Sequence, residues 1–157
     1  MSKVKLPDSK AGKLAWKGDI PITSRYTAGV AGQKFFQALK EEEKILGTVC
    51  NKCEVTYVPM KLFCERCFAQ LDETVDVGDT GRLVSFSVVY IDLDSKKVNP
   101  PQIVGLIELG NSQARMVHRL GEVKSSDLRV GMKVKAVWEM PLGREGKITD
   151  IQYFKPV

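Results

Sequence analysis

The sequence predicts a mainly β protein built from an amphipathic helix, a small module held together by its cysteines, and a five-stranded barrel. Apolar residues first recur at helical spacing, four cysteines then form two close pairs, and alternating apolar and polar residues fill the second half of the chain. With 157 residues, the chain is long enough for one modest domain and a small appendage.

The first part of the chain is expected to be an extended N-terminal arm over residues 1–29, where Lys, Gly, Pro, Ser and Thr are mixed with few apolar residues. Residues 30–46 are predicted to form an amphipathic helix, because Phe35 and Leu39 fall near one helical face. Gly47 is the predicted stop. The helix is expected to pack on its own domain, and an additional contact with a partner protein is the alternative.

All four cysteines lie in two Cys-x2-Cys pairs, Cys50 with Cys53 and Cys64 with Cys67. Two intervening residues let a tight turn aim both sulfurs at one point, and a second pair completes a tetrahedron. We expect one structural Zn²⁺ in a ribbon over residues 47–74, which is too short to bury a core without such a staple. Mononuclear iron, a disulfide and a redox dithiol are the alternatives. Four thiolates leave no open coordination position, so catalysis by this ion is not expected.

Residues 75–157 are predicted to form the barrel, because the periodicity changes there from helical to alternating. The turn sequence Val77-Gly78-Asp79-Thr80-Gly81 opens this part. After a long first strand, further strands are expected at residues 103–109, 114–120, 132–140 and 147–154. The long first strand and a longer connection between the third and fourth strands favour an OB-type barrel, and an SH3-like barrel is the alternative.

The first strand of the barrel is expected to be mostly buried, with its residues alternating between two faces. The members of one face are Val84, Phe86, Val88 and Tyr90. The members of the other face are Leu83, Ser85, Ser87, Val89 and Ile91. The residues expected to fill the barrel interior from the fourth strand are Val134, Ala136 and Trp138.

The formal net charge of +5 raises the alternative of a nucleic-acid-binding module, since OB-type barrels and zinc ribbons both serve that role. Four thiolates around one Zn²⁺ lower that charge and weaken the argument. The lysines near the N-terminus are not followed by the apolar run of a signal peptide, and no stretch is apolar enough to span a bilayer. We therefore expect a cytoplasmic protein.

The sequence predicts no catalytic residues, because it contains no Gly-rich phosphate loop, His-Glu-x-x-His or Gly-x-Ser-x-Gly motif. His118 is the only histidine, and its sequence neighbours include neither a carboxylate nor a nucleophile, so a structural or surface role is expected. Electron transfer through iron held by the cysteines is a further alternative function.

The order of helix, cysteine pairs and barrel resembles a family once catalogued as a domain of unknown function, whose members accompany thiolases. The segments that carry the resemblance are Phe35-Phe36-x-x-Leu39, Leu46-Gly47, the cysteine pairs, Val77 to Gly81, Pro100 to Leu106 and Val130 to Val134. The resemblance implies a rubredoxin-like zinc ribbon and an OB-fold. It also implies a non-catalytic acyl-CoA-binding accessory subunit that docks on a thiolase, or bridges a thiolase and a hydroxymethylglutaryl-CoA synthase, as in archaeal isoprenoid biosynthesis.

One departure from the family pattern concerns the cysteine turns. Members often place Gly after the second cysteine of a pair, whereas Glu54 and Phe68 stand at these positions here. Metal ligation survives this change, but it bears on the tightness of the turns and on their amide-to-sulfur hydrogen bonds.

An acyl-CoA site needs cations at the mouth of a groove, because the ligand joins a polyanionic nucleotide to a narrow uncharged arm. The candidates for phosphate contacts are Lys96 and Lys97 between the first two strands, and Arg115 and Arg119 on the third. An ordinary solvated barrel rim is the alternative. Pro100-Pro101 is expected to stiffen the loop that carries the lysines.

Overall fold

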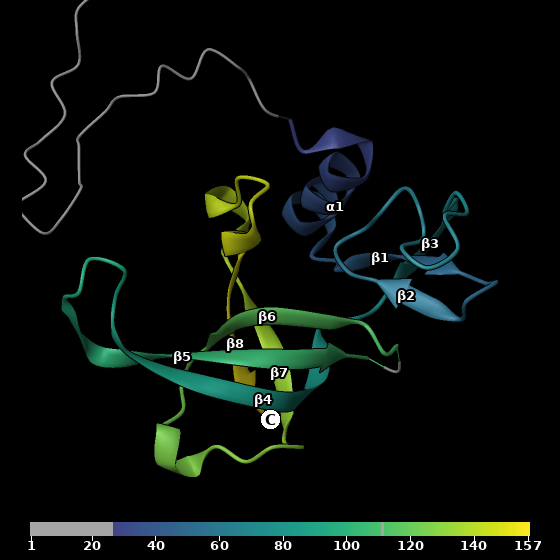
Figure 1. Cartoon of the computed structure of the whole chain (residues 1–157). Coiled ribbons are helices and arrows are strands. Elements are labelled where there is room, and N and C mark those ends of the chain that lie inside the picture. The colour runs from purple at the N-terminus through teal and green to yellow at the C-terminus, as the bar shows by residue number, and fades with distance from the viewer. Residues whose placement is uncertain (1–26, 111) are drawn as a thin grey trace, which may run out of the picture.

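The computed structural model describes residues 27–110 and 112–157, so most of the expected N-terminal arm lies outside the described residues. Helix α1 (Gly29–Glu42) precedes a three-stranded ribbon sheet and a closed barrel (Figure 1). The ribbon strands are β1 (Leu46–Cys50), β2 (Val55–Tyr57) and β3 (Glu73–Asp76). The barrel strands are β4 (Thr80–Ile91), β5 (Lys97–Leu109), β6 (Arg115–Leu120), β7 (Lys133–Trp138) and β8 (Ile151–Pro156). The short 3-10 helices are η2 (Ser125–Asp127), η3 (Pro141–Gly143) and η4 (Ile148–Asp150).

Helix α1 ends at Glu42 rather than at the predicted Leu46. Glu43 adopts a left-handed conformation with φ 54°, which closes the helix. Leu46 and Gly47 therefore begin β1, and the prediction of Gly47 as the helix stop is wrong. Gly47 serves a close approach between strands instead, because a Cβ there would lie 2.8 Å from the carbonyl oxygen of Tyr57. Across the described residues, no helix is long and apolar enough to cross a membrane.

The apolar face of α1 packs on the barrel. Phe35 and Leu39 are fully buried, and they share one core cluster with Ile151 and Phe154 of β8. The prediction that the helix packs on its own domain is therefore confirmed.

The middle of the ribbon segment, between the two cysteine pairs, also contacts this main core. Met60 is buried in the main core and Val58 packs against it, although both lie between the two cysteine pairs. A separate small cluster holds the ribbon itself and includes Tyr57 and Leu71 beside the cysteines. The main core thus extends from the barrel through the helix to the base of the ribbon.

The barrel has the strand order β4-β5-β6-β8-β7, in which β6 and β8 run parallel and the other neighbours antiparallel. This is the OB-type order, so the predicted mainly β fold with a five-stranded barrel is confirmed. Val134 and Ala136 fill the interior as expected, whereas Trp138 is only partly buried at the edge of the core. Gly81 is required where β4 meets β5, because a Cβ there would lie 2.4 Å from the carbonyl oxygen of Glu108.

Strand β4 is not mostly buried, so this prediction is wrong. Leu83 is its only buried residue, whereas Phe86, Tyr90 and Ile91 are 36%, 60% and 59% exposed. Beyond Val88, β4 and β5 continue past the last pair between β5 and β6 as a two-stranded arm that projects on the side away from the ribbon (Figure 1). We call residues 89–102 the β4–β5 arm.

A bulge between Leu83 and Ser85 also changes the predicted faces of β4. Leu83 lies opposite Ile107 and Phe86 lies opposite Gly105. Because Gly105 and Ile107 are two residues apart on β5, Leu83 and Phe86 lie on the same face, whereas strict alternation would place them on opposite faces. The assignment of these two residues to opposite faces is therefore wrong.

Two strand limits also differ from the prediction. Strand β5 begins at Lys97, so Pro100-Pro101 lies within a strand of the arm rather than in a loop. Strand β8 begins at Ile151 rather than at Lys147, because η4 turns the chain immediately before it.

Candidate metal centre and ligand surfaces

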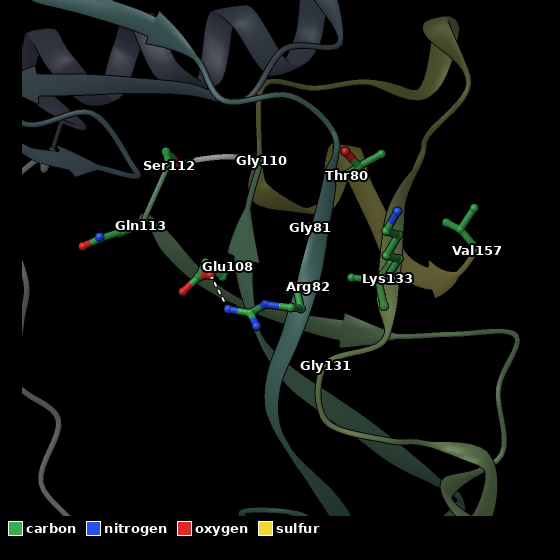
Figure 2. Close-up of a pocket in the computed structure, with 11 residues that line it drawn as sticks. Thr80, Gly81, Arg82, Glu108, Gly110, Ser112, Gln113, Gly131, Lys133 and Val157 are labelled. Atoms are coloured by element: carbon green, nitrogen blue, oxygen red, sulfur yellow. Dashed lines mark hydrogen bonds and ion pairs between the residues drawn. The ribbon is translucent and has the colours of Figure 1, made fainter.

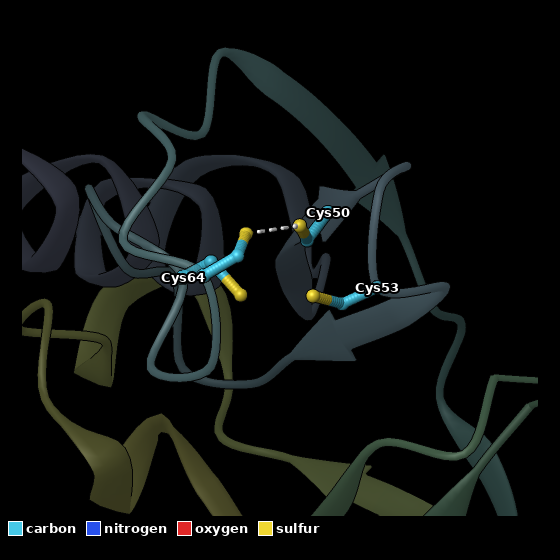
Figure 3. Close-up of side chains that lie close together, drawn as sticks. Cys50, Cys53 and Cys64 are labelled. Atoms are coloured by element: carbon cyan, nitrogen blue, oxygen red, sulfur yellow. Dashed lines mark hydrogen bonds between the residues drawn. The ribbon is translucent and has the colours of Figure 1, made fainter.

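The four cysteine sulfurs converge between the turn that follows β1 and the loop that follows β2 (Figure 3). All four Sγ atoms lie within 4.8 Å of one another, and the Sγ atoms of Cys50 and Cys67 are 3.6 Å apart. Four thiolates about 2.3 Å from a Zn²⁺ ion are separated by about 3.8 Å in a tetrahedron. All four cysteines are free thiols, and Cys50 and Cys64 are buried. The donor set therefore fits a metal ion such as zinc.

Without a cation, the surroundings of Cys53 favour its neutral thiol form. The neighbouring thiol of Cys67 and burial raise the pKa of Cys53 to about 12. A divalent cation at the centre of four sulfurs reverses this preference, because it favours the thiolate form of every ligand. The arrangement is thus better suited to holding a cation than to keeping four negative charges together.

Tyr57 supports the cysteine cluster from β2. Its hydroxyl lies 3.3 Å from the Sγ of Cys64, and this hydrogen bond lowers the pKa of Cys64 to about 6. The backbone N–H of Glu65 donates to the Tyr57 hydroxyl at 3.2 Å, which leaves the phenolic proton free to point at the sulfur. The ammonium of Lys61 lies 5.0 Å from the centre of the Tyr57 ring. The sequence analysis missed Tyr57, whose only signal was a tyrosine between the two cysteine pairs.

The turns after each cysteine pair are formed without glycine. Glu54 and Phe68 have φ of 53° and 57°, a left-handed conformation that glycine adopts at lower cost. The backbone N–H of Arg66 still donates to the Sγ of Cys64 at 3.4 Å. An amide-to-sulfur hydrogen bond is therefore present although both turns lack glycine, at the cost of local backbone strain.

Of the four cations predicted to meet phosphate, two contact carboxylates and two line different hollows. Lys96 contacts Asp94 at 3.5 Å in the turn after β4, and Lys97 lines a hollow of about 530 Å³ on the arm. Arg115 lies 3.4 Å from Glu108, whereas Arg119 lines a hollow of about 610 Å³ between β6 and β8. Lys97 and Arg119 therefore do not line the same hollow.

Another hollow, of about 650 Å³, lies where β4, β5 and β7 meet (Figure 2). Arg82 and Lys133 contribute cations to it, and Arg82 donates to Glu108 at 2.9 Å. This hydrogen bond, assisted by Arg115, holds the pKa of Glu108 below its usual range. The sequence analysis did not select Arg82 or Lys133, because the register that brings them together is set by strands distant in sequence.

The aromatic residues of the barrel that were considered for base stacking differ in their burial. Phe154 is fully buried, Trp138 is partly buried, and the Tyr153 hydroxyl donates to Glu122 at 2.7 Å. Phe86 and Tyr90 of β4 are exposed instead.

His118 is a core residue. It is 9% exposed, its ring lies edge-on to Phe154, and its Nε2 is 3.4 Å from the carbonyl oxygen of Ile148. Burial lowers the pKa of His118, which favours the neutral ring.

Comparison with known proteins identifies relatives of both the barrel and the whole arrangement. A family model described as the ChsH2 C-terminal OB-fold domain matches residues 74–139. A DUF35 domain-containing scaffold protein from Methanocaldococcus jannaschii is 28% identical over 122 residues, which cover 76% of this chain and 86% of the relative. A protein of the same description from Methanothermobacter thermautotrophicus is 26% identical over 123 residues, which cover 75% of this chain and 90% of the relative.

Solved structures show the same fold. A DUF35 family protein of unknown function from Sulfolobus solfataricus has a TM-score of 0.61 at 26% identity, over 82% of this chain and 87% of that one. A chain of the Ltp2-ChsH2(DUF35) aldolase has a TM-score of 0.61 at 22% identity, over 84% of this chain and 98% of that one. The named relatives support a scaffold or accessory role. The resemblance predicted from the sequence is thus confirmed, and the chain is similar to the DUF35 proteins, with a cysteine cluster compatible with a zinc ribbon and an OB-fold barrel.

Proposed function

We propose that this protein is a non-catalytic accessory subunit of the cytoplasm that binds acyl-CoA and associates with a thiolase, or bridges a thiolase and a hydroxymethylglutaryl-CoA synthase. The observation that carries the proposal is the similarity to two scaffold proteins over about three quarters of the chain, ribbon and barrel together. The name Ltp2-ChsH2(DUF35) aldolase, which joins a DUF35 chain to an enzyme, is in keeping with it.

In this proposal Cys50, Cys53, Cys64 and Cys67 hold one structural Zn²⁺ in a ribbon over residues 47–74. The convergence of their sulfurs supports it. Apparent zinc affinities of about 10 to 16 kcal/mol in small thiolate sites are large enough to fold a module of this size. The ion supplies structure, and the ribbon becomes a rigid surface for a partner.

The acyl-CoA site remains a proposal that rests on the resemblance. Lys97 and Arg119 are the better of the four phosphate candidates, because each lines a hollow and has no ion pair within the described residues. Lys96 and Arg115 already contact carboxylates, so they are the weaker candidates.

The proposal is tested by affinity purification of the native protein from its own organism, followed by mass spectrometry of the bound proteins and ligands. A co-purifying thiolase and bound CoA thioester are expected. Isothermal titration calorimetry with acetyl-CoA then compares the wild-type protein with its R119A variant. The variant is expected to bind acetyl-CoA about tenfold more weakly, because it has lost a phosphate contact. Failure to bind either a thiolase or acyl-CoA would remove the proposal, and salt-dependent binding of single-stranded DNA would replace it.

The zinc claim has a separate test. Cys64→Ser is expected to lower the bound zinc and to unfold the ribbon, while circular dichroism retains the signal of most of the barrel. A coloured protein whose absorption bleaches on reduction would show iron instead. Complete loss of barrel structure would contradict the view that the ribbon folds as a separate module.

A further inference from the structure

Strand β4 has one edge without a partner strand beyond Leu83 in the described part of the chain. Strand β7 pairs with β4 only at Thr80–Arg82, and the backbone of Leu83 bonds to Gly131 and Met132. From residue 84 to residue 91, the only strand beside β4 in the described part of the chain is β5. The backbone donors and acceptors on the other edge of β4 are therefore available to another strand.

The opposite edge of the arm is protected. Strand β6 pairs with β5 only from Ile103 to Glu108, which leaves the first residues of β5 without a strand on that side. This stretch contains Lys97, Pro100 and Pro101. Prolines have no backbone N–H to donate and lysine discourages pairing, which are the usual means of closing a sheet edge. The two edges of the arm are thus built differently, and only the β4 edge is suited to accept a strand.

The open edge also carries no charge. Residues 83–91 contain neither a charge nor a proline, in a chain in which 27% of the residues are charged. Phe86, Tyr90 and Ile91 are exposed on this stretch. An unprotected edge with exposed aromatic side chains is an aggregation hazard unless another strand covers it.

The sequence of β4 is complementary to itself in the antiparallel direction. If a two-fold axis passes through Val88, this residue lies opposite Val88 of a second copy, and Phe86 lies opposite Tyr90 of that copy. Cross-strand pairs of aromatic and of β-branched residues are the favourable kind. This pairing opposes no like charges, since the stretch has none.

We propose that the open edge of β4 pairs with the same edge of a second copy of this chain, centred on Val88, to form a two-fold symmetric dimer with a continuous β5-β4-β4-β5 sheet. This inference is independent of the proposed accessory role. Such a dimer would carry two copies of the ribbon, related by the two-fold axis.

The test is the mass of the full-length, zinc-loaded protein in solution, measured by light scattering after size exclusion over about a thousandfold range of concentration. Wild type is expected at twice the mass of one chain. Val88→Lys places two like charges against each other on the axis and is expected to weaken the dimer by at least about tenfold. The matched control is Val117→Lys, which puts the same charge on an exposed valine of β6 and should leave the dimer unchanged.

A second variant keeps the test decisive if Val88→Lys fails to fold. With oxidised glutathione as the oxidant, Val88→Cys is expected to form a disulfide between two chains, whereas Val117→Cys is not. A wild-type monomer at every concentration would overturn the proposal. It would equally be overturned if the Val88 and Val117 variants behaved alike, or if Val88→Lys released an enzyme partner while leaving the mass of the isolated protein unchanged.

Discussion

Arg144 joins the barrel to helix α1, and its removal is the sharpest test of how the parts hold together. This side chain lies between β7 and β8 and is only 7% exposed. Its Nε donates to the carbonyl of Glu139 at 3.0 Å, and its Nη1 donates to the carbonyl of Lys40 at 3.1 Å. Its Nη2 also contacts the carboxylate of Glu43, just beyond the helix.

The cost of Arg144→Ala follows from these contacts. Each hydrogen bond from a charged donor to a carbonyl contributes about 1.5–3 kcal/mol. The ion pair with Glu43 adds less than about 1 kcal/mol, because the Glu43 side chain is 47% exposed. Allowing for partial rehydration of the two carbonyls, we expect a loss of about 3–4 kcal/mol in the free energy of unfolding. A domain of this kind has only about 5–15 kcal/mol in total.

The measurement is urea denaturation of the zinc-loaded protein, followed by far-ultraviolet circular dichroism. Glu43→Ala is the matched control and should cost less than about 1 kcal/mol, since it removes only the exposed ion pair. Arg144→Lys should fall between the two variants, because a single ammonium does not reproduce the two-carbonyl geometry. An Arg144→Ala variant within about 1 kcal/mol of wild type would refute the reasoning.

Three further predictions concern the ribbon and the core. Tyr57→Phe removes the hydroxyl near the Cys64 sulfur, so zinc affinity in competition with a chelator should fall about tenfold, and an unchanged affinity would contradict this role. Phe68→Gly should raise ribbon stability by about 0.5–1 kcal/mol, because glycine relieves a left-handed backbone and Phe68 is 79% exposed; a lower urea midpoint would show that its side chain matters more. Burial lowers the pKa of His118, so below its ordinary pKa of about 6.5 the unfolded chain binds a proton that the folded chain does not. Stability should therefore fall from pH 7 to pH 5, and an equal slope in His118→Gln would rule out this cause.

The metal centre could be predicted from the sequence because its geometry is local. Two residues between the members of each pair fix how their sulfurs point, and only the meeting of the two pairs depends on the fold. The support from Tyr57 could not be predicted, since its distance to Cys64 depends on how β2 lies against the second loop.

The exposure of β4 could not be predicted, although the existence of the strand could. Alternating apolar residues indicate a strand, but they do not show where its neighbours end. The bulge after Leu83 also shifts by one residue which side chains of β4 lie on each face of the sheet. No residue type at this point predicts a bulge. The one available signal was Pro100-Pro101, which is typical of a strand edge that lies outside a barrel.

The ligand surfaces were the least predictable part. Cationic residues are visible in a sequence, but their partners are not. Arg115 and Arg82 meet the same carboxylate of Glu108, because three strands place these residues side by side. A cation chosen from the sequence is therefore a weak candidate until its neighbours in the sheet are known.

Met60 gives the ribbon an attachment that its two chain ends alone would not provide. The polypeptide enters the ribbon beside Ile45, returns to the main core at Met60, and leaves beside Val77. The backbone N–H of Val77 donates to the carbonyl of Ile45 at 3.0 Å, so the two chain ends form one attachment, and Met60 adds a second one that opposes hinge-like rotation of the ribbon. A partner that touches ribbon and barrel together therefore meets two surfaces whose relative orientation is set before contact, and association need not spend free energy on aligning them.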